Sequence, residues 1–188
     1  MDKIKIAFLL SAAFIGLLAC SHNPNTSPHG VTEPSDSGIY YPYSPIYSGG
    51  FKTGNYKYLK IVTEIWKEFE NGDITRKASD FADSVTIVYP DRILNGKTDS
   101  ILRAVKKTRD KYLSVQSFIY SWMPARAKDH NDDWVFIWGR QELTDKGGKM
   151  KTAEVHEIWQ FNNQGKIIQM QQYVSRASYL LEQSKELY

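Results

Sequence analysis

Few residues of this chain are of a type that could carry chemistry, and the plainest of them is a single thiol. Cys20 is the only cysteine in the sequence. It follows an apolar run from Ile6 to Ala19, which Lys3 and Lys5 precede. Positive charge, an apolar run and small residues before a cleavage point are typical of a secretory signal. A lone thiol in an exported protein needs an explanation, and acylation supplies one.

The motif Leu17-Leu18-Ala19-Cys20 is similar to a lipobox, the signal for placing diacylglycerol on the cysteine and cutting the chain before it. We therefore expect residues 1–19 to be a lipoprotein signal peptide and Cys20 to carry acyl chains such as palmitate, which anchor the protein to a membrane. An ordinary secretory signal and an uncleaved anchor helix are the alternatives. Ser21 resembles the sorting pattern for the outer membrane, so the expected location is the bacterial cell envelope, and specifically that membrane.

Other chemical motifs are weak. The stretch Asp129-His130-Asn131-Asp132-Asp133 is rich in oxygen and nitrogen, but it lacks the spacing of a calcium loop and is expected to be a polar turn without metal. The sequence has no phosphate loop, nucleophile elbow or zinc pattern, so no cofactor is expected. A net charge of +3 is too mild to indicate nucleic acid as a partner.

The length of 188 residues allows one domain. Apolar residues recur every three or four positions from 55 to 69 and from 99 to 112, which predicts two amphipathic helices. Thr98 or Asp99 is expected to cap the second helix, whose buried side includes Tyr112. A shorter helix is predicted at 74–82, a hairpin at 85–94 around Pro90-Asp91, and a closing helix at 175–187.

Four long strands are predicted at 115–126, 134–143, 149–161 and 166–174, because turn residues separate them. Helices segregated from an antiparallel sheet make an α+β domain, expected to span 52–188. Residues 20–51 are expected to be the lipidated cysteine and a tether. The aromatic and apolar end of this tether either folds back over an edge of the domain or docks a partner; its members are Ile39, Tyr40, Tyr41, Tyr43, Ile46, Tyr47 and Phe51.

The order of these elements, with Asn71-Gly72-Asp73, Phe81-Ala82-Asp83 and Gly165-Lys166-Ile167-Ile168 at the junctions, resembles the nuclear transport factor 2-like superfamily over about residues 55–175. The SnoaL-like branch is the most similar. The resemblance implies a cone, in which a curved antiparallel sheet wraps around the N-terminal helices and leaves a pocket at the open end. Isomerases, dehydratases, cyclases and binding domains share this cone, so the fold does not decide the chemistry.

The resemblance also allows catalytic positions of ketosteroid isomerases to be tested. Their general base corresponds to Tyr89, a poor base because a phenol has a pKa near 10. Their hydroxyl donor corresponds to Ile65, which donates nothing, and their protonated acid corresponds to Glu157. Cyclases of the SnoaL type use an acid near the end of the last strand, and this chain has no Asp or Glu between Gly165 and Leu181.

If Glu157 faces inward, alternation along the strand places His156 and Glu154 on the outer face. Glu157 then has either a raised pKa and a hydrogen bond to a ligand oxygen or a structural ion pair with Arg140 or another base on a neighbouring strand. Trp159 and Met170 are pocket residues or ordinary core. The expected pocket set is Tyr89, Val155, Glu157, Trp159, Met170 and Gln172.

Both faces of the strand at 134–143 are apolar, with Trp134, Phe136 and Trp138 on one and Val135 and Ile137 on the other. A large exposed apolar patch is unusual for a monomer, so we expect a homodimer through the outer face. The leading functional hypothesis is a noncatalytic domain that binds a small, largely apolar molecule. The alternatives are a hydratase, dehydratase or isomerase with Glu157 as acid and help from Tyr89, and an accessory protein that acts through residues 40–47 and the outer face.

Overall fold

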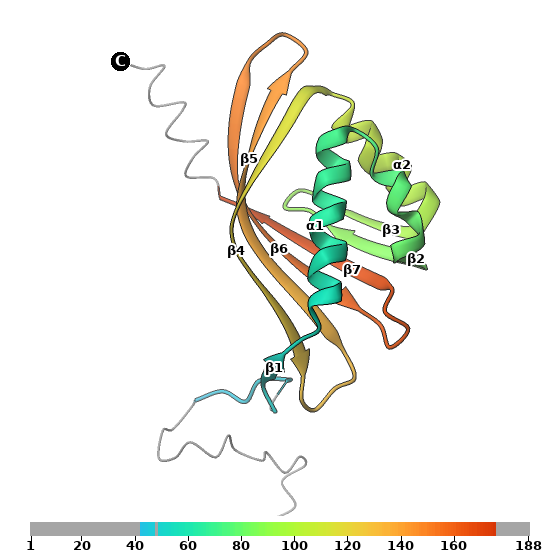
Figure 1. Cartoon of the computed structure of the whole chain (residues 1–188), viewed down its shortest axis with the longest axis vertical. Helices are drawn as coiled ribbons and strands as arrows, with labels where there is room; N and C mark the ends of the chain where they lie inside the picture. The colour runs from blue at the N-terminus through green and yellow to red at the C-terminus, as the bar shows by residue number, and fades with distance from the viewer. Residues whose placement is uncertain (1–41, 48, 176–188) are drawn as a thin grey trace, which may run out of the picture. The chain divides into compact units, whose positions relative to one another are not determined.

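The structure is a computed structural model that describes residues 42–47 and 49–175 (Figure 1). The expected signal peptide, Cys20, Ser21, most of the tether and all but the first residue of the expected closing helix lie outside the described residues. No helix in the described part of the chain is long and apolar enough to cross a membrane.

The first helix, α1 (Tyr56–Asn71), begins and ends where the sequence indicates. The Asn55 side chain accepts a hydrogen bond from the Lys57 N–H at 2.9 Å, which satisfies one free donor of the first turn. Gly72 ends the helix at a φ of 95°, a conformation that glycine adopts without steric cost. The buried side of α1 consists of Tyr58, Leu59, Val62, Ile65 and Trp66.

The segment after α1 differs from the prediction at its boundaries. A 3₁₀ helix (Ile74–Asp80) replaces the expected helix at 74–82, because Phe81 already begins β2 (Phe81–Val88). The hairpin is completed by β3 (Ile93–Lys97). Helix α2 (Thr98–Arg109) follows, but the predicted cap is wrong: the Thr98 hydroxyl donates to the carbonyl of Ala82, and no side chain caps the helix.

The remaining strands are β4 (Tyr112–Ala127), β5 (Asp133–Asp145), β6 (Met150–Phe161) and β7 (Ile167–Val174). Tyr112, expected on the second helix, therefore starts a strand. The sheet has the order β1-β4-β5-β6-β7-β2-β3. The four long strands form the predicted antiparallel meander, and β2 joins its far side in parallel with β7. Figure 1 shows α1 and α2 on the same side of this curved sheet.

The edge of β4 is covered by β1 (Phe51–Thr53), in which Phe51 pairs with Ala127. Tyr47, ahead of β1, packs its ring edge-on to Trp134 at 5.8 Å between centroids. The Gly49 N–H donates to Asp129 at 2.8 Å. The end of the predicted tether thus lies against the domain, as one of the two interpretations of the sequence requires.

Candidate ligand site

A cavity of about 200 Å³ lies between the sheet and the helices. Its walls come from α1, the 3₁₀ helix, α2, the β2–β3 turn and the inner faces of β4 to β7. Aromatic and apolar side chains dominate, with few polar groups among them, as in most small-molecule pockets. The lining residues are Ile65, Trp66, Phe69, Ile74, Tyr89, Pro90, Asp91, Arg92, Val105, Thr108, Tyr112, Gln141, Leu143, Glu157, Trp159, Met170 and Gln172.

Glu157 is the central polar residue of the cavity and is only 4% exposed. Its carboxylate accepts three hydrogen bonds. The indole N–H of Trp66 donates to Oε2 at 2.6 Å and that of Trp159 to the same oxygen at 3.0 Å. The side-chain amide of Gln172 donates to Oε1 at 2.9 Å. Residues from α1, β6 and β7 therefore converge on one carboxyl group.

Burial raises the pKa of Glu157 above its ordinary value, although the hydrogen bonds from Gln172, Trp66 and Trp159 oppose the shift. Desolvation penalises a charged group that lacks a countercharge. The predicted structural alternative, an ion pair with Arg140, is wrong, because Arg140 instead contacts Glu142 at 3.1 Å. Arg140 follows Gly139 on β5 and faces the opposite side of the sheet from Gln141.

Tyr89 lies at the end of β2 and lines the same cavity. Burial, followed by the nearby charge of Glu157, raises the pKa of its hydroxyl well above the ordinary value of a phenol. The guanidinium of Arg92 lies 4.8 Å from the centre of its ring. Within the described residues the hydroxyl has no hydrogen-bond partner, so it is placed as a donor to a ligand and not as a base.

Five of the six expected pocket residues line this one cavity: Tyr89, Glu157, Trp159, Met170 and Gln172. Val155 faces inward as alternation predicts and is buried in the core, but it lies outside the cavity lining. The contribution of Trp66 was not anticipated. The sequence placed this residue on the buried stripe of α1, but no pattern indicated that its N–H would reach a strand 91 residues away.

Gly139 lets Trp66 reach that position. A β-carbon at this residue would lie 2.5 Å from the carbonyl oxygen of Phe118 and 3.2 Å from the Trp66 ring. Real β-carbons do not come as close as the first contact, so the approach of β4 to β5 at this point requires glycine. The second contact shows that the Trp66 ring lies in the space that a side chain would need. The glycine therefore leaves room for the ring at the place from which Trp66 donates to Glu157.

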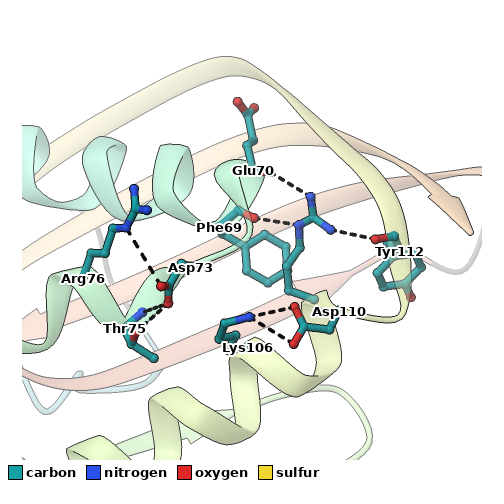
Figure 2. A network of polar contacts seen from close by, with 9 residues as sticks. Phe69, Glu70, Asp73, Thr75, Arg76, Lys106, Asp110 and Tyr112 are labelled. Atoms are coloured by element: carbon teal, nitrogen blue, oxygen red, sulfur yellow. Dashed lines mark hydrogen bonds and ion pairs between the residues drawn. The ribbon is translucent and has the colours of Figure 1, made fainter.

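Arg109 has a buried side chain and binds the backbone of two residues that line the cavity, Phe69 and Tyr112. Its guanidinium donates to the carbonyls of Phe69 and Glu70 at 2.8 Å each and to the carbonyl of Tyr112 at 2.9 Å (Figure 2). The first two are carbonyls of the last turn of α1, where a cation is favoured. Arg109 thus ties α1 to the start of β4 and fixes two cavity-lining rings.

The turn at 129–133 is built from hydrogen bonds. Asp129 accepts from Gly49 and His130, and Asp132 accepts from the Tyr47 hydroxyl at 3.2 Å. Arg126 contacts Asp133. Among residues 42–47 and 49–175 no group of three potential ligands is placed to hold a metal ion.

Known structures share this architecture at low sequence identity. One is an NTF2-like protein of unknown function from Exiguobacterium sp. 255-15, with 14% identity and a TM-score of 0.51 over 61% of this chain and 98% of that one. Another is AusH from Aspergillus nidulans, with 14% identity and a TM-score of 0.53 over 67% and 88%. The chain has the nuclear transport factor 2-like fold.

The predicted NTF2-like cone is therefore confirmed, as is the α+β class. A third similar structure is the epoxide hydrolase/cyclase-like enzyme SalBIII, which acts in pyran ring formation in the polyether salinomycin, with 16% identity and a TM-score of 0.50 over 65% and 93%. No family model matches the sequence, and no curated protein matches it significantly. Because NTF2-like proteins differ in activity, function has to be argued from the cavity itself.

Proposed function

We propose that this chain is a noncatalytic binding domain of the SnoaL-like type, whose cavity takes up a small, largely apolar molecule next to Glu157. The observation that carries the proposal is the set of three fixed donors around a buried carboxylate in an otherwise aromatic cavity. Such a carboxylate is preorganised, and it offers a ligand one strong acceptor among apolar walls. A cavity of about 200 Å³ lies below the usual range of drug-sized sites, which supports a compact ligand.

Two features argue against catalysis. The position of a general base is held by Tyr89, whose raised pKa keeps the hydroxyl protonated near neutral pH. Glu157 and Asp91 are the only carboxylates among the lining residues of the described cavity, and Asp91 is bound to Arg92 at 2.9 Å. Glu157 is therefore the only carboxylate of this cavity not held in an ion pair, and its oxygens already accept three hydrogen bonds.

An enzymatic role is the second candidate, and one observation favours it. Glu157 has a raised pKa, and the unpartnered Tyr89 hydroxyl lines the same cavity. A protonated Glu157 could act as the acid of a hydratase, dehydratase or isomerase, with Tyr89 as a second donor to the substrate oxygen.

The envelope location belongs to the same proposal. Lipid on Cys20 would hold the domain at the membrane surface, and two copies would pair through the outer face of β5 and β6. Support for pairing comes from the partly exposed aromatic rings on that face and from the exposed Met123, which pairs with Phe136 from β4.

Native purification of the full chain, followed by mass spectrometry of molecules released on denaturation, tests the binding role. We expect a stoichiometric amount of a small molecule from the wild type and a smaller amount from Glu157→Gln. The replacement removes the negative charge and keeps the side-chain volume, so a loss of binding reports on the charge. Gln171→Glu, one residue from Gln172 but on the other face of β7, is the matched control and should retain the molecule. A wild-type protein that is folded and empty contradicts the proposal. Conversion of a released carbonyl compound by the wild type, but not by Glu157→Gln, would favour the enzyme.

A further inference from the structure

We propose that the cavity is selective for a small organic cation, an amine whose ammonium group pairs with Glu157 while its hydrocarbon part packs against the surrounding rings. This inference rests on the proposed binding function and adds the charge of the ligand. It is carried by three features of the cavity: the kind of groups that contact Glu157, the lack of a countercharge, and the aromatic walls.

The contacts of Glu157 are those of an ionised carboxylate. Trp66 and Trp159 carry indole N–H groups, which can only donate, and both point at Oε2. Gln172 donates to Oε1. A protonated carboxyl group would need an acceptor for its own hydrogen, and Oε2 faces two donors instead. The hydrogen bonds therefore favour the negative charge that burial disfavours.

No cation in the described residues neutralises this charge. The only other charged lining residues, Asp91 and Arg92, contact each other at 2.9 Å and cancel. Arg109 is not part of the cavity lining, and its guanidinium donates to three backbone carbonyls. Since a buried charge is costly unless it is paired, the cavity with ionised Glu157 lacks one positive charge. A ligand cation supplies it.

The walls suit a cation as well. The lining rings are Trp66, Phe69, Tyr89, Tyr112 and Trp159. Aromatic faces attract ammonium groups, most strongly where water is excluded. Tyr89 already has one cation over its ring, the guanidinium of Arg92 at 4.8 Å. A neutral ligand would gain only the apolar part of these contacts, and an anion would be repelled by Glu157.

Three probes of the same skeleton test the proposal: cyclohexylammonium, cyclohexanol and cyclohexanecarboxylate. The full chain is labelled with 5-fluorotryptophan, so that fluorine NMR gives signals from its five tryptophans. Trp122, Trp134 and Trp138 lie outside the cavity lining and are assigned by replacement with phenylalanine. The two remaining signals, from Trp66 and Trp159, report on the cavity. Titrations are made at pH 8, where the amine is charged.

We expect cyclohexylammonium to shift the two cavity signals and to bind about tenfold or more tighter than cyclohexanol, a factor that corresponds to one good ionic contact. Cyclohexanecarboxylate should bind most weakly. In Glu157→Gln the preference for the cation over the alcohol should disappear, while binding of the alcohol is retained.

The outcomes separate the two proposals. If cyclohexanol binds as tightly as the cation or tighter, the cavity binds small molecules but the charge selectivity is overturned. If no probe moves the Trp66 and Trp159 signals, the binding function fails together with the inference. The comparison of the three probes on the wild type alone decides the matter, so it does not depend on whether Glu157→Gln folds.

Discussion

The two faces of β5 and β6 carry similar aromatic side chains but differ in whether the polar atoms of those rings are hydrogen-bonded. On the inner face, both tryptophan N–H groups that line the cavity donate to Glu157. On the outer face, Trp134 Nε1 and His156 Nε2 are buried without a hydrogen-bond partner among the described residues. The outer rings form a row, in which neighbouring centroids are 4.7 to 6.5 Å apart: Trp134, Phe136, Trp138 and His156.

The difference shows which face is complete. An unsatisfied buried polar atom costs about 1–3 kcal/mol, so native proteins leave few of them. On the inner face, the N–H groups of Trp66 and Trp159 are both satisfied, because they donate to the carboxylate of Glu157. The outer face leaves two polar atoms without a partner among the described residues, Trp134 Nε1 and His156 Nε2, so its hydrogen bonding is less complete. Two matched pairs of substitutions and a pH series can break or sharpen this comparison.

The largest effect is expected for Gly139→Ala. The new β-carbon would lie 2.5 Å from the Phe118 carbonyl oxygen and 3.2 Å from Trp66, so backbone and helix must shift. Overpacking of this kind costs about 1–3 kcal/mol or more, and it should also pull the Trp66 N–H away from Glu157. Urea denaturation measures the first effect, and the indole ¹⁵N–¹H signal of Trp66 measures the second.

Gly147→Ala is the matched control, because Gly147 lies in the exposed β5–β6 turn and its nearest neighbour is the flexible Asp145 side chain at 3.3 Å. It should unfold at nearly the wild-type urea concentration. Equal losses in the two variants would show that the contact between Gly139 and Trp66 does not matter.

An intermediate loss of stability is expected when a tryptophan is replaced by phenylalanine, and the loss should differ between the two faces. Trp159→Phe removes a donor to Glu157, a hydrogen bond to a charged group that contributes about 1.5–3 kcal/mol. Trp134→Phe is the same chemical change on the outer face, where the lost N–H has no partner. We expect Trp159→Phe to lower the free energy of unfolding clearly more than Trp134→Phe. A larger loss for Trp134→Phe would mean that the outer face is the more tightly organised of the two.

The smallest effect is expected in the pH dependence of stability. Because burial raises the pKa of Glu157 above the ordinary 4.5, the folded protein keeps a proton that the unfolded chain loses. Stability should therefore fall as the pH rises from about 4.5 through the raised pKa. The free energy of unfolding of the wild type minus that of Glu157→Gln, measured from pH 2 to 9, should decrease as the pH rises above about 4.5.

Asp129→Asn is the control for the pH series, because the pKa of Asp129 is lowered in the fold whereas that of Glu157 is raised. The N–H of Gly49 is the main cause that lowers the pKa of Asp129 to about 2, so its contribution is present above the ordinary pKa and is lost as the pH falls from about 3.8 towards 2. This variant should change only the acid side of the profile. A Glu157→Gln difference that grew with pH would show that folding favours the ionised carboxyl.

Periodicity and alternation were sufficient to predict most of the fold and the inward side of β6. Spacing in threes and fours located α1 and α2, and turn residues located the four long strands. Alternation put Glu157 and Trp159 on one face and His156 on the other, because side chains on a strand change sides at every residue, and the resemblance to the cone fold suggested which face is the inner one. These are local properties, which a sequence records directly.

The predictions that failed depend on contacts between distant segments. Alternation gives the side on which Val155 lies but not how far along the strand the cavity extends. The role of Trp66 depends on how closely α1 crosses β5 at Gly139, and the Thr98 cap was lost because its hydroxyl bonds to Ala82 on β2. The ion pair of Arg140 is an exception, because Glu142 lies two residues further on the same strand and alternation places both side chains on one face.

The parallel pairing of β2 with β7 has a consequence for the time at which the site forms. Ile87 pairs with Met170, and Gln172 completes the contacts of Glu157 from the last described strand. Contacts between such distant segments form slowly, because a long loop must close first. While the chain is being made, α1 and the hairpin emerge long before β7. The cavity therefore forms only after β7 has been synthesised.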